Sequence, residues 1–134
     1  MSWTGRAVQQ DGNAAVKRGD FQAALAHYDK ALHLNTAATA ARSNRALCFL
    51  QLGRFEEALV DCDAVLSQEP RNVKALLRRA QACAELGRRD EACSTWQGVL
   101  DIEPGNAQAR RHLDAASSGG DEGDAADGQE PATG

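Results

Sequence analysis

The chain has 134 residues, a length that suits one domain with a single buried core, and 43% of its residues are hydrophobic. Its formal net charge is −4, but residues 1–116 hold 15 basic and 14 acidic side chains, so no broad basic surface for nucleic acid is expected. No segment approaches the ~20 apolar residues that span a bilayer, and we therefore expect a cytoplasmic chain without membrane insertion.

A period of 34 residues organises most of the chain. The sets that recur at this interval include Gly19, Gly53 and Gly87; Ala24, Ala58 and Ala92; Leu32, Leu66 and Leu100; and the small residues Gly12, Ala46 and Ala80. So many coincidences at one spacing indicate three copies of one structural unit, at residues 5–38, 39–72 and 73–106.

Each unit is predicted to be a helical hairpin. Apolar residues follow helical spacing on both sides of the repeated glycine. Glycine favours the left-handed turn between two helices, and a proline closes the second and third units. The predicted helices, in chain order, are 6–18 and 21–34, 39–52 and 55–68, and 73–86 and 89–102.

The repeated positions also predict how the hairpins pack. Small residues such as Gly12 and Ala24 let two helices approach closely, and the larger Tyr28 and Trp96 fill the space beside them. Arg45 and Arg79 each precede a small alanine, and we expect their aliphatic stems to lie along the seam between helices.

The C-terminal residues divide into two segments. Residues 107–116, AQARRHLDAA, continue as a seventh helix whose charged outer face suits a solubilising cap on the last hairpin. Residues 117–134 contain five acidic side chains and almost no core-forming residue, so we predict a disordered acidic tail.

The phrases GNAAVKRGDFQAALAHYDKAL, SNRALCFLQLGRFEEALVDCDAVL and VKALLRRAQACAELGRRDEA carry a family resemblance. The chain resembles a three-repeat tetratricopeptide domain with its capping helix, over residues 5–116. The resemblance implies an all-α, right-handed superhelical solenoid of helix-turn-helix repeats, in which the first helix of each unit lines a concave groove.

Five positions on the first helices resemble the carboxylate clamp of co-chaperone tetratricopeptide domains. In that family, lysine, two asparagines, lysine and arginine bind the C-terminal Glu-Glu-Val-Asp tail of heat-shock protein 70 or 90. This chain has Asn13, Asn44, Lys74 and Arg78 at four of the positions and departs from the pattern at Gln9, where the family has lysine.

The chemistry of these residue types agrees with that implication. Lys74 and Arg78 are four residues apart and share a helix face, where two like charges repel unless an anion lies between them. Arginine offers a planar fork to a carboxylate, and asparagine amides offer neutral donors. Gln9 keeps a donor and lacks the charge; Arg6, one turn earlier, could supply it.

We therefore expect a protein-protein interaction adaptor that is co-chaperone-like and monomeric. The alternative is a structural scaffold or assembly component that binds a partner without a carboxylate clamp. No nucleophile-base pair, phosphate loop or cofactor motif indicates an enzyme, and His27, His33 and His112 are interpreted as exposed helix residues. The cysteines lack metal-site spacing and are interpreted as small buried residues: Cys48, Cys62, Cys83 and Cys93.

Overall fold

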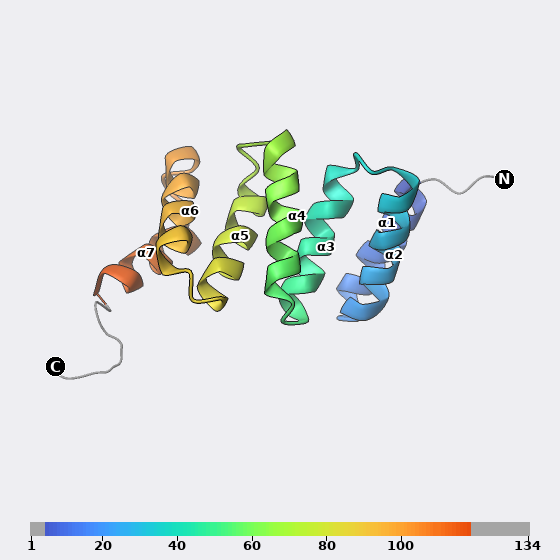
Figure 1. The fold of residues 1–134 in the computed structure, drawn as a ribbon, viewed down its shortest axis with the longest axis horizontal. Coiled ribbons are helices and arrows are strands. Elements are labelled where there is room, and N and C mark those ends of the chain that lie inside the picture. Colours follow the sequence, from blue (N-terminus) through green and yellow to red (C-terminus); the bar gives the residue numbers. More distant parts are fainter. Residues whose placement is uncertain (1–4, 119–134) are drawn as a thin grey trace.

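The computed structural model describes residues 5–118, which form seven α-helices and no strand (Figure 1). The helices are α1 (Gly5–Lys17), α2 (Phe21–Leu34), α3 (Thr39–Gln51), α4 (Phe55–Gln68), α5 (Val73–Glu85), α6 (Arg89–Ile102) and α7 (Ala107–Ser118). The all-α solenoid is confirmed, and each helix begins and ends within two residues of its predicted bounds. Because α7 runs to Ser118, the first two residues of the predicted tail are helical; the rest of the tail lies outside the described residues.

The three repeated glycines make the turns that the sequence predicted. Gly19, Gly53 and Gly87 have φ angles of 77°, 75° and 78°, a left-handed conformation that glycine adopts without steric penalty. After each glycine the backbone N–H returns to a carbonyl of the preceding helix, as Arg54 N does to Phe49 O at 2.8 Å. Each turn therefore satisfies the carbonyls of one helix and reverses the chain into the next.

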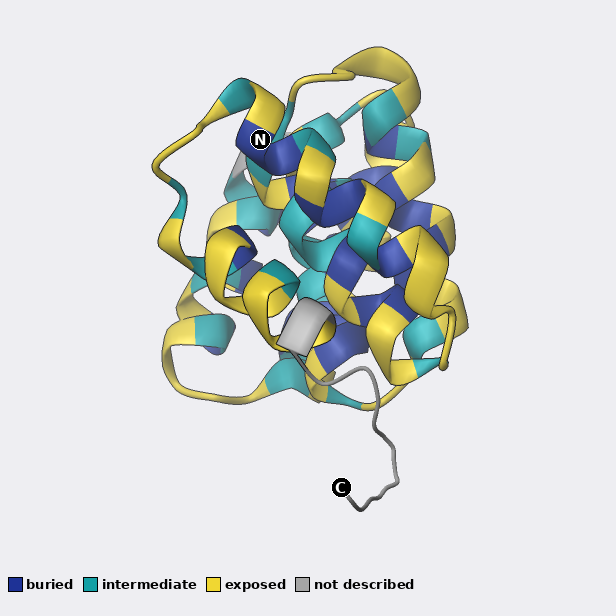
Figure 2. Ribbon diagram, turned by 90° about the vertical axis from the view of Figure 1, so that its left-hand side faces the viewer, coloured by how far each residue is buried: buried dark blue, intermediate teal, exposed yellow. Residues whose placement is uncertain are grey.

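The helices follow one another along the long axis of the molecule, from α1 and α2 at one end to α6 and α7 at the other (Figure 1). Consecutive helices pack on each other, and α3 also contacts both α1 and α5. The first helices of the three units, α1, α3 and α5, thus form a continuous layer, which we call the first-helix layer. Buried residues lie along the helix faces that meet between neighbouring helices, whereas the outward faces and connecting loops are largely exposed (Figure 2).

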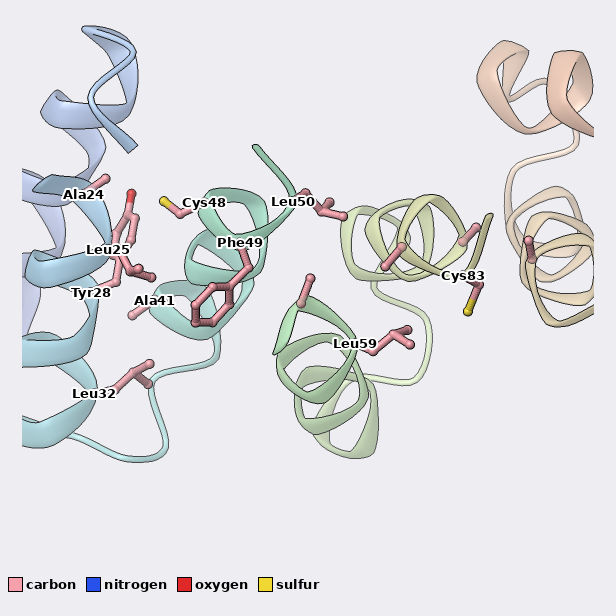
Figure 3. Close-up of a cluster of buried hydrophobic side chains, with 14 of the residues drawn as sticks. Ala24, Leu25, Tyr28, Leu32, Ala41, Cys48, Phe49, Leu50, Leu59 and Cys83 are labelled. Atoms are coloured by element: carbon pink, nitrogen blue, oxygen red, sulfur yellow. The ribbon is translucent and has the colours of Figure 1, made fainter. Parts of the chain in front are cut away.

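The small residues allow the close packing that was predicted. Ala24, Ala46 and Ala80 are fully buried. Gly12 lies directly against the ring of Tyr28, because a Cβ placed on Gly12 would be 2.7 Å from Tyr28 Cε1. Figure 3 shows the side chains of Tyr28, from α2, and Cys48, from α3, in the same buried cluster.

The C-terminal helix makes one contact that the sequence did not predict. Trp96 is buried and His112 is an exposed helix residue, both as predicted, and the two rings are in contact. The His112 ring stacks on the Trp96 indole, with centroids 4.3 Å apart and planes 5° apart. The exposed His112 ring therefore covers part of the last apolar surface, a contact that depends on how α7 docks on α6.

Arg45 and Arg79 are structural residues, as predicted, and their guanidinium groups form ion pairs that the sequence did not predict. Arg45 on α3 donates through Nε and Nη2 to Asp61 on α4, at 2.8 and 2.7 Å, and through Nη1 to Asp29 on α2 at 2.9 Å. Arg79 on α5 binds Asp63 on α4, and Thr95 and Glu91 on α6. Each arginine thus connects the second helices of two successive units; we call Arg45, Arg79 and these partners the arginine ladder.

The described residues also bear on membranes and metals. In residues 5–118, no helix is both long and apolar enough to cross a bilayer. Within the same range, no group of three or more histidine, cysteine or acidic side chains is arranged to hold a metal ion. Cys48, Cys62 and Cys83 are buried as interpreted from sequence, whereas Cys93 is only partly buried.

Candidate functional site

The five predicted site residues all lie on the first-helix layer. Gln9 and Asn13 are on α1, Asn44 is on α3, and Lys74 and Arg78 are on α5. Because α3 contacts both α1 and α5, it is the helix through which these side chains can interact.

The two asparagines are hydrogen-bonded to each other across the first repeat boundary. Asn44 Nδ2 donates to Asn13 Oδ1 at 3.1 Å. The Tyr28 hydroxyl, from α2, donates a hydrogen bond to the same Asn13 oxygen. Asn13 and Asn44 are partly exposed, whereas Tyr28 is buried beneath them. The amide pair is thus held from below by a buried phenol.

The Arg78 side chain, from α5, contacts α3 at Ser43, the residue next to Asn44. Its Nη1 donates to the backbone oxygen and to Oγ of Ser43, both at 2.8 Å. Ser43 is buried and directly precedes Asn44 in the chain. The structure therefore brings Asn13, Asn44 and Arg78 together around one turn of α3; with Tyr28 and Ser43 they form what we call the polar cluster.

The Arg78 charge has no anionic partner among the described residues. Burial lowers the pKa of its guanidinium, and this effect is opposed by Cys62, Cys48 and Tyr28. Those groups are themselves neutral at pH 7. Burial raises the pKa of Cys62 to about 12, that of Cys48 to about 11 and that of Tyr28 to about 12. A half-buried cation is thus held by two neutral oxygens.

The other two predicted residues stand apart from the polar cluster. Lys74 is exposed one turn before Arg78, and it forms no hydrogen bond or ion pair with any residue that the structure describes. Gln9, one turn before Asn13, is partly exposed and likewise has no such partner within residues 5–118. The predicted contribution of Arg6 stays a prediction, because its side chain is outside the part of the chain that the structure describes.

Sequence reasoning missed two members of the polar cluster. Tyr28 was predicted only as a space-filling core residue, although a buried tyrosine hydroxyl usually finds a hydrogen-bond partner. One signal was available in the sequence: at this repeat position the other units have Cys62 and Trp96, so only the first unit has a hydroxyl there. Ser43 carried no comparable signal, because its role depends on where the Arg78 side chain ends.

A second candidate surface has different electrostatics. A hollow of about 340 Å³ lies between α2, α3 and α4, and its lining includes Phe49, Arg45 and Arg54. Both arginines are already paired, Arg45 with Asp29 and Asp61 and Arg54 with Glu57. This hollow offers no uncompensated arginine, so the polar cluster is the stronger candidate for recognition of an anion.

The polar cluster has the groups that a carboxylate requires. Arg78 supplies a delocalised cation, Lys74 supplies a mobile point charge one turn away, and the amides supply neutral N–H donors. Hydrogen bonds from charged donors to a carboxylate contribute roughly 1.5–3 kcal/mol each. A carboxylate would also provide the anion that Arg78 lacks in the described chain.

Among known proteins, parts of this chain are similar to short segments of longer proteins. Sperm-associated antigen 1 of Rattus norvegicus is 39% identical over 49 residues, which are 37% of this chain and 6% of that protein. Hsp70-Hsp90 organizing protein 1 of Glycine max is 44% identical over 43 residues, which are 32% of this chain and 8% of that protein. The matched segments thus span less than a tenth of these relatives.

Solved structures resemble nearly the whole described fold. The Arabidopsis OM64 TPR domain is 34% identical with a TM-score of 0.83, covering 85% of this chain and 94% of that domain. The first TPR of Spaghetti (RPAP3), bound to the HSP90 peptide SRMEEVD, is 27% identical with a TM-score of 0.83, covering 86% and 91%. The second TPR domain of human RPAP3, in complex with the HSP70 peptide SGPTIEEVD, is 31% identical with a TM-score of 0.77, covering 82% and 92%.

Family models give the same assignment. Two models of the tetratricopeptide repeat match residues 11–64 and 49–111, which together include all three predicted units in whole or in part. With the repeat period, the helix order and the similarity to the OM64 domain, they establish that the chain belongs to the tetratricopeptide repeat family.

Proposed function

We propose that this chain is a cytoplasmic, co-chaperone-like adaptor that binds the C-terminal Glu-Glu-Val-Asp tail of heat-shock protein 70 or 90 on its first-helix layer. Two similar tetratricopeptide domains support the proposal, since they bind peptides ending in Glu-Glu-Val-Asp, one from HSP90 and one from HSP70. The similarity to Hsp70-Hsp90 organizing protein 1 adds support.

The observation that carries the proposal is the unpaired charge of Arg78. A partly buried cation without a counterion is unfavourable, because desolvation is not offset by attraction to an anion. Arg78 is held in that state by Ser43, with Lys74 one turn away and the Asn13 and Asn44 amides alongside. A terminal aspartate offers two carboxylates to this set of donors.

Each residue has a distinct role in the proposed complex. Arg78 binds a carboxylate or a peptide carbonyl through its planar fork, and Lys74 attracts a carboxylate as a flexible point charge. Asn13 and Asn44 fix the orientation of the carboxylate oxygens by donating neutral hydrogen bonds. Gln9 adds a donor without a charge, so binding through this position is weaker than with the family lysine.

The free terminal carboxylate provides the test. A peptide ending in Glu-Glu-Val-Asp is titrated by calorimetry against the same peptide with an amidated C-terminus. We expect amidation to weaken binding by at least about tenfold, because it removes a charge-assisted hydrogen bond. Equal affinity for the two peptides, or no binding of either, would overturn the proposal and favour the scaffold alternative.

Neighbouring arginines supply a matched pair of variants. We expect Arg78→Ala to lower affinity by roughly 10- to 150-fold, which corresponds to the loss of one charge-assisted bond, and Lys74→Ala to weaken binding in the same direction. Arg79→Ala removes an equal charge one residue away, from the arginine ladder, and should leave affinity nearly unchanged. Far-UV circular dichroism at the titration temperature checks that all variants remain folded.

A further inference from the structure

The amide of Asn13 can be placed in either of two polarities, and its neighbours decide between them. Its Oδ1 accepts hydrogen bonds from both the Tyr28 hydroxyl and Asn44 Nδ2. With both donors on the oxygen, the Asn13 NH2 group is directed away from them. No residue that the structure describes accepts a hydrogen bond from this NH2 group.

The opposite polarity would change what the site can recognise. If the Asn13 amide were flipped, its NH2 group would face Tyr28 and Asn44, and its oxygen would face outward. An outward oxygen would repel a carboxylate and accept from an N–H group instead. The orientation of one amide thus separates an anion site from a site that favours a neutral amide terminus.

Tyr28 is placed so that the flipped arrangement is unfavourable. Its ring is buried against the backbone of Gly12, so the hydroxyl cannot move to water. Flipping Asn13 alone would set its NH2 group against the NH2 group of Asn44. It would also remove the oxygen to which the Tyr28 hydroxyl donates, and losing this acceptor is costly for a group out of contact with solvent. Burial and Cys48 raise the pKa of Tyr28 to about 12, although the Asn44 side chain and Arg78 act in the opposite direction. The hydroxyl is therefore protonated at neutral pH and can donate a hydrogen bond.

We infer that Tyr28 is a positioning residue whose buried hydroxyl fixes the polarity of the Asn13–Asn44 pair, so that an Asn13 N–H faces the ligand and a carboxylate terminus is preferred to an amide. The inference rests on the proposed function for its ligand and deepens it. Tyr28 itself does not contact the peptide; it acts through Asn13. In the other units the same repeat position is Cys62 or Trp96, neither of which can donate an O–H bond.

Tyr28→Phe isolates the hydroxyl, since the ring that packs on Gly12 is retained. We expect the ratio of affinities for acid and amidated Glu-Glu-Val-Asp peptides to fall by roughly two- to tenfold, the usual effect of one hydrogen bond. The ratio is the readout because a general loss of stability would weaken both peptides alike. A ratio unchanged from wild type would overturn the inference.

A double-mutant cycle tests whether Tyr28 acts through Asn13. The acid-to-amide ratio is measured for Tyr28→Phe, Asn13→Ala and the combined variant. If the hydroxyl acts by orienting the Asn13 amide, Tyr28→Phe should have no further effect once Asn13 is alanine. Independent effects that add in the combined variant would show that Tyr28 acts by another route and would contradict the inference.

The free protein gives a readout that needs no peptide. Side-chain amide resonances of Asn13 and Asn44 are compared by NMR in wild type and Tyr28→Phe. The inferred polarity predicts that both Asn13 side-chain protons exchange rapidly with water and that the variant shifts the resonances of both amides. Protected Asn13 protons, or unchanged resonances, would overturn the positioning role. If the wild type binds no peptide, the proposed function and the carboxylate preference are both overturned. The spectra of the free protein test the positioning role of Tyr28 independently of that result.

Discussion

Arg78 and Arg79 are adjacent on α5, yet their surroundings are opposite. Arg79 belongs to the arginine ladder and is bound to Asp63, Glu91 and Thr95. Arg78 belongs to the polar cluster, where its only partner within the described chain is the neutral Ser43. Successive helical residues point about 100° apart, so adjacent identical side chains reach different neighbours.

The difference separates arginines that join helices through ion pairs from an arginine that we propose binds the ligand. Ladder arginines are compensated by carboxylates, so an added anion gains little there. The charge of Arg78 is desolvated without compensation, an arrangement that typically marks functional sites in proteins. The sequence shows the same side chain at both positions and does not distinguish their surroundings.

The largest expected effect arises at alkaline pH, beneath the polar cluster. Burial raises the pKa of Cys48 to about 11 and that of Cys62 to about 12, above the ordinary thiol value of 9.0. Between about pH 9 and pH 12 the unfolded chain therefore binds fewer protons than the folded chain, and stability falls as pH rises. We expect urea denaturation to show a loss of several kcal/mol between about pH 8 and pH 11.

A Cys48→Ala, Cys62→Ala double variant should make the dependence of unfolding free energy on pH less steep. The remaining slope comes from Tyr28 and Cys83, whose pKa values burial also raises. The chain contains a single tyrosine, so tyrosinate absorbance reports on Tyr28 alone, with an expected midpoint near 12. An unchanged slope in the double variant would show that the buried thiols do not cause the loss.

The next effect comes from removing the buried carboxylate that binds a ladder arginine. The Asp61 side chain is 1% exposed and receives two hydrogen bonds from Arg45, which is itself 22% exposed. Asp61→Ala leaves Arg45 with only Asp29 from its carboxylate pairs, and we expect the free energy of unfolding to fall by about 3 kcal/mol. Chemical denaturation measures this change.

Asp29→Ala is the matched control, because it removes the other carboxylate from the same arginine. The Asp29 side chain is 56% exposed, and surface ion pairs contribute about 0–1 kcal/mol. If both substitutions lowered stability equally, burial of Asp61 would not explain the role of the ladder.

The smallest expected effect concerns Gln9, the position at which the first-helix layer departs from the family pattern. Gln9→Lys adds a cation one turn before Asn13, and we expect it to tighten binding of the acid peptide by about 1 kcal/mol. Gln10→Lys adds the same charge at an exposed neighbour and should change affinity much less. Equal gains from the two variants would indicate general electrostatic attraction rather than a contact at position 9.

Much of the fold could be predicted because it depends on local rules repeated three times. The spacing of Gly19, Gly53 and Gly87 predicted the boundary between the two helices of each unit, since the left-handed turn at glycine ends the first helix and starts the second. The placement of Asn13 and Arg78 on one layer followed from the same period. Which atoms these side chains bind did not follow, because a long side chain can reach several neighbours at similar spacing.

The sequence by itself determined the family, the order of helices and the set of polar residues on the first-helix layer, because periodicity records which positions face the core. Only the tertiary structure decided how those residues are connected. It paired Arg79 with acids and left Arg78 with Ser43, joined Asn13 to the Tyr28 hydroxyl, and stacked His112 on Trp96. These contacts join different helices, and their partners depend on the docking of whole helices, which local spacing does not specify.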